Sequence, residues 1–393
     1  MTTRQQIEVD QDLIIGAQPT FLPQTKLVKR WTAVPSSSSP NYGGETLFTI
    51  AAKSMDFLSD CVIGFNVAAS TFSAGTAFLR MGALSFVDSI EVRTSNSSVL
   101  VRYSRDVLYA LSRRLLNQAE MGKFDAAIGL ASTDPTTSKT YFIPLNFLPW
   151  SKHTNYSGSL AVGALSSDLI VSLVFRNSAN ILDGGATLTA MGAISNTILY
   201  LEGVKAPAAL QDFKDTLAAH GKISRLMDDF VECPSQTIAS GSTACDVEIG
   251  GVPGAHLKWV MFGVRQAADL TTPGAIDPVS WQSFSSFSIG DGQGNSLGSS
   301  FQVPQLFQLS VSDDDLPNDY NSSTVLSLMS FSLQPDQKSS QTNQSSGGIR
   351  LSQSPRLIAS FSSTGQINTV FLLAAIHSVL VISADGSISK SSL

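Results

Sequence analysis

Short apolar segments alternate with turn-forming residues along most of the chain from Glu45 onward. In the first half of the chain, seven such segments are bounded by Gly, Ser, Asn and Asp, and their lengths are typical of strands. This pattern predicts an all-β sandwich or jelly roll. The expected strands cover residues 46–52, 61–68, 85–93, 99–103, 140–148, 168–176 and 194–204.

Two helices are expected among these strands. Ser104 is a suitable N-cap for the first helix, Asp106 lies where the helix dipole favours a carboxylate, and Gly122 is expected to end the helix. The second helix follows residue 204, because Pro207 fits a first helical turn and Gly221 a helix stop. Apolar strand-like segments stand on both sides of this second helix, so we expect it to connect two domains.

The second half of the chain predicts another all-β domain of similar size. Its expected strands cover residues 223–230, 245–249, 257–266, 280–289, 300–311, 325–333, 356–361 and 367–382. The first 43 residues differ, because four prolines and a run of four serines give them poor strand and helix propensity. We expect an extended arm there, which either reaches a neighbouring subunit or is a solvated tail.

The composition favours packing against neighbours over wrapping nucleic acid. Charged residues make up 14% of the chain, hydrophobic residues 43%, and the formal net charge is -6 with a pI of about 5.2. Such a chain lacks the basic field that binds phosphate backbones, so we expect no direct sequence-specific nucleic-acid binding. The basic residues Lys26, Lys29 and Arg30 are the local exception; they either contact an anionic surface or are a solvated strand flank.

The sequence carries none of the strong catalytic motifs. GxSxG, HExxH and Walker sequences do not occur, and the four histidines are too dispersed for a metal site, so we expect no enzyme, cofactor or metal. The three cysteines are too few and too scattered for a disulfide framework. The N-terminal residues lack the apolar core of a secretory signal, and the longest apolar run, 370–376, is too short to cross a bilayer. We therefore expect folding in the cytosol.

Three weaker signals each allow two interpretations. The glycines of residues 290–294 resemble a phosphate loop but open no helix, which favours an ordinary turn. The acidic loop 313–319 either holds a hard cation or is a solvated turn, and it lacks the residue order of a calcium loop. Trp150 and Trp281 could line a sugar groove, as in a β-sandwich carbohydrate-binding module or glycosidase, or pack in the core.

Several segments occur in the order found in one family of proteins. Residues 141–147 (YFIPLNF) are similar to that family's apolar-Pro-Leu-x-Phe signature, and 168–175 (DLIVSLVF) to a segment that follows it. Residues 256–266 (HLKWVMFGVRQ) and 371–386 (FLLAAIHSVLVISADG) look like strands of its second domain. The chain from Gly44 onward thus resembles the double jelly-roll major capsid proteins of nucleocytoplasmic large DNA viruses, virophages and membrane-containing phages.

The resemblance implies an all-β double jelly roll with short helical insertions and a helical connector. It divides the chain into an extended arm (1–43), a first jelly roll (44–205), the connector (206–222) and a second jelly roll (223–393). It further implies a structural protein of the virion, synthesised and assembled inside the host cell. Homotrimers would form pseudo-hexagonal capsomers that contact neighbouring capsomers and tile an icosahedral shell.

The resemblance also assigns partners to the N-terminal region. Lys26, Lys29 and Arg30 would lie near an internal lipid membrane or near minor capsid, penton or membrane proteins. A shell protein and the carbohydrate-binding alternative differ in a simple way. The first must form trimers, whereas the second needs exposed aromatic side chains that a sugar can reach.

Overall fold

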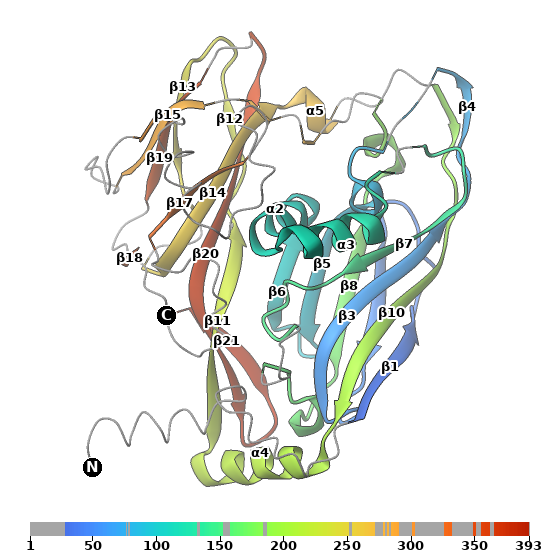
Figure 1. Cartoon of the computed structure of the whole chain (residues 1–393), viewed down its shortest axis with the longest axis vertical. Helices are drawn as coiled ribbons and strands as arrows, with labels where there is room; N and C mark the ends of the chain where they lie inside the picture. Colours follow the sequence, from blue (N-terminus) through green and yellow to red (C-terminus); the bar gives the residue numbers. More distant parts are fainter. Residues whose placement is uncertain are drawn as a thin grey trace.

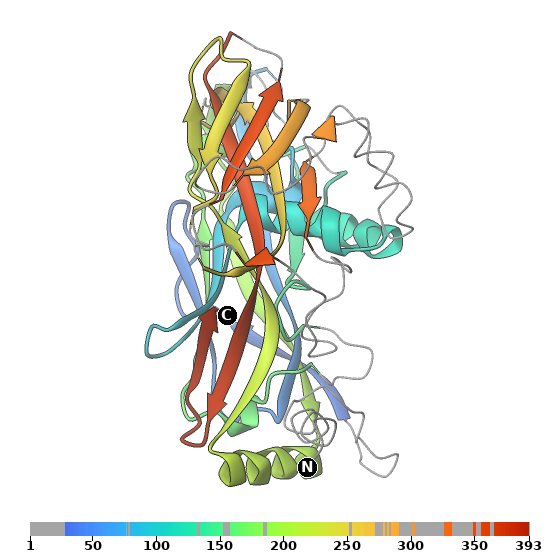
Figure 2. The same ribbon diagram turned by 90° about the vertical axis from the view of Figure 1, so that its left-hand side faces the viewer.

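The structure is a computed structural model in which two β-rich lobes stand side by side (Figure 1). Helix α4 (Pro207–His220) crosses from one lobe to the other at one end of the long axis. The edge-on view shows how narrow the molecule is in the other direction (Figure 2). The structure describes residues 28–392 except 76, 78, 132–133, 152–157, 184–186, 251–253, 272–277, 280, 283, 291–300, 303–325, 332–348, 351–354 and 362–364.

Lobe 1 is built from two antiparallel four-stranded sheets with the strand orders β1-β10-β3-β7 and β2-β8-β5-β6. A two-stranded ribbon of β4 and β9 extends at one end (Figure 1). The strands are β1 (Val28–Pro35), β2 (Glu45–Ile50), β3 (Phe57–Val67), β4 (Thr71–Ala74), β5 (Val87–Thr94), β6 (Val99–Ser104), β7 (Lys139–Pro144), β8 (Leu169–Phe175), β9 (Thr187–Ala190) and β10 (Ile194–Lys205). Three 3₁₀ turns join them: η1 (Gly82–Phe86), η2 (Val162–Ala164) and η3 (Ser178–Asn180).

Lobe 2 repeats this plan. One sheet has the order β11-β20-β14-β17, with β12, β18 and β21 alongside, and the other has the order β13-β19-β15-β16. The strands are β11 (Lys222–Glu232), β12 (Gln236–Ile238), β13 (Ala244–Glu248), β14 (His256–Gln266), β15 (Phe284–Gly290), β16 (Phe301–Gln302), β17 (Ser327–Ser330), β18 (Ile349–Arg350), β19 (Arg356–Phe361), β20 (Asn368–Ser383) and β21 (Ile388–Ser392). The short helix α5 (Ala268–Thr271) follows β14.

The two lobes have the same sheet topology. In each lobe the first strand pairs with a strand from late in that lobe, β1 with β10 and β11 with β20. The sheet β1-β10-β3-β7 of lobe 1 therefore corresponds to β11-β20-β14-β17 of lobe 2. In the same way, β2-β8-β5-β6 corresponds to β13-β19-β15-β16. All of these strand pairs are antiparallel. This is the arrangement of two packed sheets that defines a jelly roll. The all-β double jelly roll predicted from the sequence is confirmed.

The pattern of side chains explains which strands lie at the surface. Strand β7 alternates, with Tyr141 and Ile143 buried and Phe142 exposed, because only one face of its sheet meets a core. Strand β20 is buried almost without interruption from Asn368 to Ser378. A continuous apolar run of this kind indicates that both faces of a strand are covered. In β20 one face meets lobe 1, as described below.

The helices differ from the prediction at Gly122, which was expected to end the first helix. Ser104 caps α2 (Arg105–Leu115) by accepting a hydrogen bond from the Val107 amide, as expected. Gly122 does not end this helix. A second helix, α3 (Gln118–Ile128), begins at a capping box formed by Asn117 and Glu120, and Gly122 lies inside it. The αL residue Gly129 ends α3. Among the described residues, none of the helices is long and apolar enough to cross a bilayer.

Part of the predicted irregular arm is a strand. Residues 28–35 form β1, which pairs along its whole length with β10. None of the four prolines lies inside β1: Pro35 is its last residue, Pro40 follows it, and Pro19 and Pro23 precede it in sequence. Strand β1 is also an edge strand, where proline is tolerated. Short strands β4, β9, β12, β18 and β21 were also not predicted, and the expected strand at 280–289 begins only at Phe284.

The environments of Gly122 and Gly129 predict that substitution by alanine changes the stability of the protein in opposite directions. A Cβ at Gly122 meets no atom within 4 Å, so Gly122→Ala should stabilise the protein by about 0.5–1 kcal/mol. Gly129 has φ +70°, so Gly129→Ala should destabilise it by about 1 kcal/mol. Denaturant unfolding of both variants measures the difference. Equal effects would contradict the helix boundary at Gly129.

Candidate functional site: the contact between the two lobes

The hydrophobic core of lobe 1 continues across the contact between the two lobes. The β11-β20-β14-β17 sheet has an inner face, turned toward the second sheet of lobe 2, and an outer face, turned toward lobe 1. On the outer face Trp259, Met261 and Leu373 are at most 2% exposed and belong to the same apolar cluster as the core of lobe 1. On the inner face Val260 and Phe262 belong to a separate cluster inside lobe 2. The contact between the lobes is therefore an extension of the lobe 1 core.

Aromatic side chains cross this contact. The Tyr103 ring of β6 lies 6.3 Å from Phe230 of β11, which in turn lies 5.7 Å from Trp259 of β14. The Tyr103 hydroxyl donates to the carbonyl of Phe147 at 2.9 Å, which satisfies its polar atom. Burial, together with the nearby charges of Asp229 and Asp228, raises the pKa of Tyr103 well above its ordinary value. Tyr103 is thus a neutral packing residue.

One ion pair joins the lobes next to these rings. Asp106, in the first turn of α2, accepts from Arg265 of lobe 2 at 2.5 Å and from Arg105 at 3.1 Å. Arg265 also donates to the carbonyl of Pro278 at 2.7 Å and lies over the Trp281 ring at 4.6 Å. Burial would raise the pKa of Asp106, but the positive charges of both arginines outweigh it, so the pKa lies well below its usual range.

A second group of buried charges lies in lobe 2. The Lys258 ammonium is 3.1 Å from Asp228, and Nδ1 of His377 is 3.6 Å from the same carboxylate. Both Lys258 and His377 are at most 2% exposed. Next to them, Asp229 pairs with Lys390 of β21 at 2.9 Å. Lys258, Asp228 and Asp229 each have a partner of opposite charge, as burial in a medium of low polarity requires.

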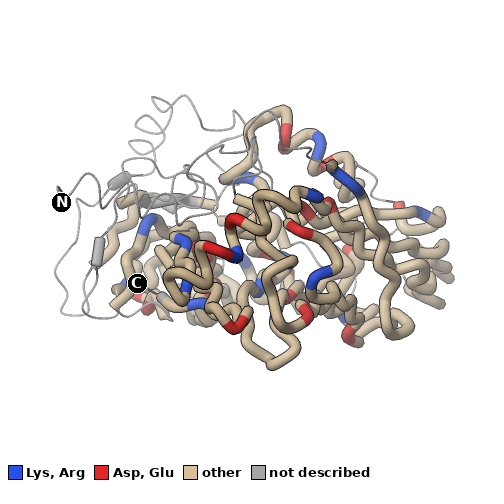
Figure 3. The backbone as a smooth tube through the Cα atoms, turned by 90° about the horizontal axis from the view of Figure 1, so that it is seen from below, with Lys and Arg blue, Asp and Glu red and all other residues tan. Residues whose placement is uncertain are grey.

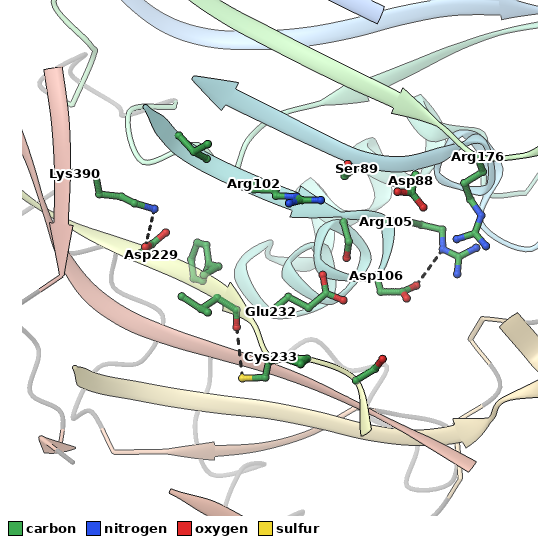
Figure 4. Close-up of a pocket in the computed structure, with 16 residues that line it drawn as sticks. Asp88, Ser89, Arg102, Arg105, Asp106, Arg176, Asp229, Glu232, Cys233 and Lys390 are labelled. Carbon is green, nitrogen blue, oxygen red and sulfur yellow. Dashed lines mark hydrogen bonds and ion pairs between the residues drawn. The ribbon is translucent and has the colours of Figure 1, made fainter. Parts of the chain in front are cut away.

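A groove of about 570 Å³ opens between the lobes beside these pairs (Figure 4). Lobe 1 contributes Arg102, Arg105 and Arg176, and lobe 2 contributes Asp229, Glu232 and Lys390. With Asp88 and Asp106, the lining carries equal numbers of basic and acidic side chains. The groove is therefore close to neutral overall.

The chemistry of the groove fits a contact surface better than a reaction centre. Desolvation and the charge of Arg105 lower the pKa of Arg176 to about 10, which leaves it positive at neutral pH. Partial desolvation, and then the charge of Asp106, raises the pKa of Glu232. Burial raises the pKa of the Cys233 thiol to about 12, so this sulfur stays protonated and is a poor nucleophile.

A turn of lobe 2 contacts lobe 1 at the end near α4. The carbonyl of Gly386, in the β20–β21 turn, accepts from the Ser166 amide at 2.9 Å. Gly386 has φ +77°, and a Cβ there would lie 2.7 Å from the backbone nitrogen of Ser166. Close by, Phe213 and Leu217 of α4 join the shared core. The connector is thus packed against both lobes.

The basic residues predicted from the sequence lie elsewhere. Lys29 is on β1, where its ammonium lies 2.8 Å from Glu202 of β10, and Arg30 is next to it and exposed. Strand β1 is at the side of lobe 1 away from lobe 2 (Figure 1). Lys26 is outside the described residues. Viewed from below, basic and acidic positions are interspersed along the described backbone (Figure 3).

The sugar-groove interpretation of the tryptophans is wrong. Trp150 is 1% exposed and Trp281 is 7% exposed, so neither ring presents a face that a sugar could stack on. Trp281 is instead covered by Arg265 and packs 5.8 Å from Phe371. The loops 291–300 and 313–319, which carry the other weak signals, lie outside the described residues.

Comparison with known proteins identifies the fold. No family model and no curated protein sequence matches the chain. Among solved structures, VP54 of PBCV-1, fitted into a reconstruction of the virophage Sputnik, has a TM-score of 0.75 at 11% identity and covers 95% of this chain and 100% of its own. The Faustovirus major capsid protein has a TM-score of 0.74 at 11% identity, covering 92% and 91%.

A third structure extends the likeness beyond these viruses. The MCP of STIV has a TM-score of 0.52 at 12% identity, covering 89% of this chain and 96% of its own. The likeness spans both lobes and their connection, so it concerns the whole arrangement and not one sheet. The fold is the double jelly roll of viral major capsid proteins, and the resemblance seen in the sequence is confirmed.

The ion pair between the lobes predicts a stability that depends on pH. The lowered pKa of Asp106 means that its contribution is complete at neutral pH and is lost as the pH falls below the ordinary value of 3.8. Asp106→Asn should therefore cost about 3 kcal/mol at pH 7, and less as the pH is lowered from 4 to 2.5. Denaturant unfolding at these pH values measures the change. If the difference in unfolding free energy between Asp106→Asn and the wild type stays constant with pH, the charge of Asp106 is not responsible for it.

The exposed pair Asp246–Arg356 is the matched control for this experiment. Its atoms are 2.7 Å apart, but both side chains are more than a third exposed. Solvent screens such a pair, so Asp246→Asn should change the free energy of unfolding much less than Asp106→Asn at pH 7.

The turn at Gly386 predicts that a side chain at this position destabilises the protein through the contact between the lobes. In Gly386→Ala the new Cβ would have an unfavourable φ and would also clash with the backbone of Ser166. In Gly365→Ala the φ of +68° is equally unfavourable, but the new Cβ would lie in open space. Gly365→Ala should cost about 1 kcal/mol and Gly386→Ala clearly more. Thermal unfolding of both variants provides the test, and equal losses would contradict the contact between this turn and lobe 1.

Proposed function

We propose that this chain is the major capsid protein of a virus, a structural protein without catalytic activity. The supporting observation is that a double jelly roll with fixed lobes accounts for nearly the whole chain, as in the Faustovirus major capsid protein. In this proposal three chains form a pseudo-hexagonal capsomer with six lobes, and capsomers tile an icosahedral shell. The protein resides in the virion after synthesis and assembly inside the host cell.

The contact between the lobes supports this role physically. A capsomer subunit must keep its two lobes in one orientation, because a hinge between them would change the outline that neighbouring capsomers contact. Here a shared core, the Asp106–Arg265 pair and the Gly386 turn all fix that orientation. Interfaces with continuous apolar packing resist the relative motion that is common between domains.

We further propose a division into an arm, a first jelly roll, a connector at 206–222 and a second jelly roll at 223–393, in which β1 (Val28–Pro35) belongs to the first jelly roll and not to the arm expected at 1–43. The arm and the start of β1 would face the inside of the shell. Val28 lies opposite Lys205, directly before α4, so Lys29, Arg30 and α4 belong to one end of the molecule. Lys26, Lys29 and Arg30 would there contact lipid headgroups of an internal membrane or a minor capsid, penton or membrane protein.

The oligomeric state is the first test of this function. Light scattering of the purified protein should give about 125 kDa, three times the chain mass of 41.7 kDa, and negative-stain images should show rings with six lobes. A particle of 41.7 kDa at every concentration would contradict the proposal.

A further inference from the structure

The groove between the lobes has two ends that differ in how their charges are paired. At one end Lys390 and Asp229 form an ion pair of 2.9 Å, so these two charges cancel (Figure 4). At the other end the guanidinium groups of Arg105, the first residue of α2, and Arg176, directly after β8, lie next to each other (Figure 4). We call the part of the groove around Arg105 and Arg176 the arginine end.

The buried carboxylate at the arginine end is shared by two other contacts. Asp106 accepts from Arg105 at 3.1 Å and from Arg265 of lobe 2 at 2.5 Å. Both arginines are almost completely buried, with exposed fractions of 2% and 3%. One carboxylate therefore serves two guanidinium groups, and it forms no ion pair with the third, Arg176, which is part of the described chain as well.

Arg176 has a hydrogen bond but no ion pair among the residues that the structure describes. Its Nε donates to the carbonyl of Asn180 at 3.2 Å, and no described acceptor binds its two Nη atoms. Desolvation, and then the charge of Arg105, lower the pKa of Arg176 to about 10, although Asp106 and Asp88 act in the opposite direction. Arg176 is thus a partly desolvated cation beside a second cation, without a carboxylate of its own.

The charges around the arginine end leave one positive charge in excess. The basic residues are three that line the groove, Arg102, Arg105 and Arg176, and one behind the lining, Arg265. The acidic residues are Asp88, Asp106 and Glu232. Four positive charges thus face three negative charges. One bound anion would balance this end and offset the repulsion between the two adjacent guanidinium groups.

The donors at the arginine end suit an oxyanion. A guanidinium group presents N–H donors in a planar fork that matches the oxygen atoms of a carboxylate or a phosphate. Ser89 lines the groove as well, and a serine hydroxyl is able to donate to the same kind of oxygen. The groove volume of about 570 Å³ is many times the roughly 30 Å³ that one water molecule occupies, so an oxyanion has room to enter.

We propose that the arginine end of the groove binds one oxyanion group, a phosphate or a carboxylate, through the side chains of Arg105 and Arg176. This site goes beyond the proposed capsid role and does not depend on it. The anion would lie beside the Asp106–Arg265 pair that joins the lobes. Its binding therefore strengthens the contact between the lobes and stabilises the folded chain.

Thermal unfolding in the presence of inorganic phosphate or acetate tests this site. Each salt is compared with sodium chloride at the same ionic strength. At least one of the two anions should raise the Tm of the wild type more than chloride does, because an anion that binds only the folded state stabilises it. A larger effect of phosphate identifies a phosphate site, and a larger effect of acetate a carboxylate site. Phosphate also stabilises proteins in general, so variants must locate the effect.

Two substitutions in the groove should change the affinity for the anion in opposite directions. Arg176→Gln removes a charge that holds the anion, so the affinity measured by isothermal titration calorimetry should fall by about 10-fold or more. Glu232→Gln removes a negative charge from the lining, so the affinity should rise by about 3-fold or more. Arg356→Gln is the matched control, because it removes a partly exposed arginine on β19, in the other sheet of lobe 2, and should leave the affinity unchanged.

The outcomes test the site separately from the capsid role. Circular dichroism checks that each variant is folded. The proposal is overturned if neither anion stabilises the wild type beyond chloride, or if a folded Arg176→Gln variant binds the anion as the wild type does. If Arg176→Gln does not fold, Glu232→Gln decides, since an unchanged or lower affinity contradicts the site. None of these results bears on whether the chain forms trimers.

Discussion

The need to cover both faces of one sheet governs this structure. The β11-β20-β14-β17 sheet presents apolar side chains such as Trp259, Leu373 and Val260 in both directions. Its inner face is covered within lobe 2, but its outer face can be removed from water only by another body. Lobe 1 supplies that body, and burial of large apolar side chains is worth about 1.5–3 kcal/mol for each. The relative position of the lobes follows from this requirement.

Polar interactions add direction to this apolar contact. An apolar surface alone tolerates sliding, whereas Arg265 must meet both the Asp106 carboxylate and the Pro278 carbonyl. The turn at Gly386 imposes a further condition, because it fits against Ser166 only with a left-handed backbone and without a side chain. Geometry of this kind gives the lobes a single arrangement.

The sequence predicts the local structure well and the long-range contacts poorly. Alternation and turn residues located most strands, and β14 (His256–Gln266) differs from the expected strand 257–266 by one residue. Asp106 was recognised only as a favourable residue of a helix N-terminus. Its partner Arg265 lies 159 residues further along the chain, and no local pattern links them. For the same reason Trp281 could be placed either in a sugar groove or in the core, until the fold showed Arg265 over its ring.

Helix α4 makes the contact between the lobes an encounter within one chain. Its 14 residues tether the lobes, so that lobe 2 meets lobe 1 of its own chain at a local concentration in the millimolar range. The contact within one chain is therefore favoured over an exchange of lobes between chains.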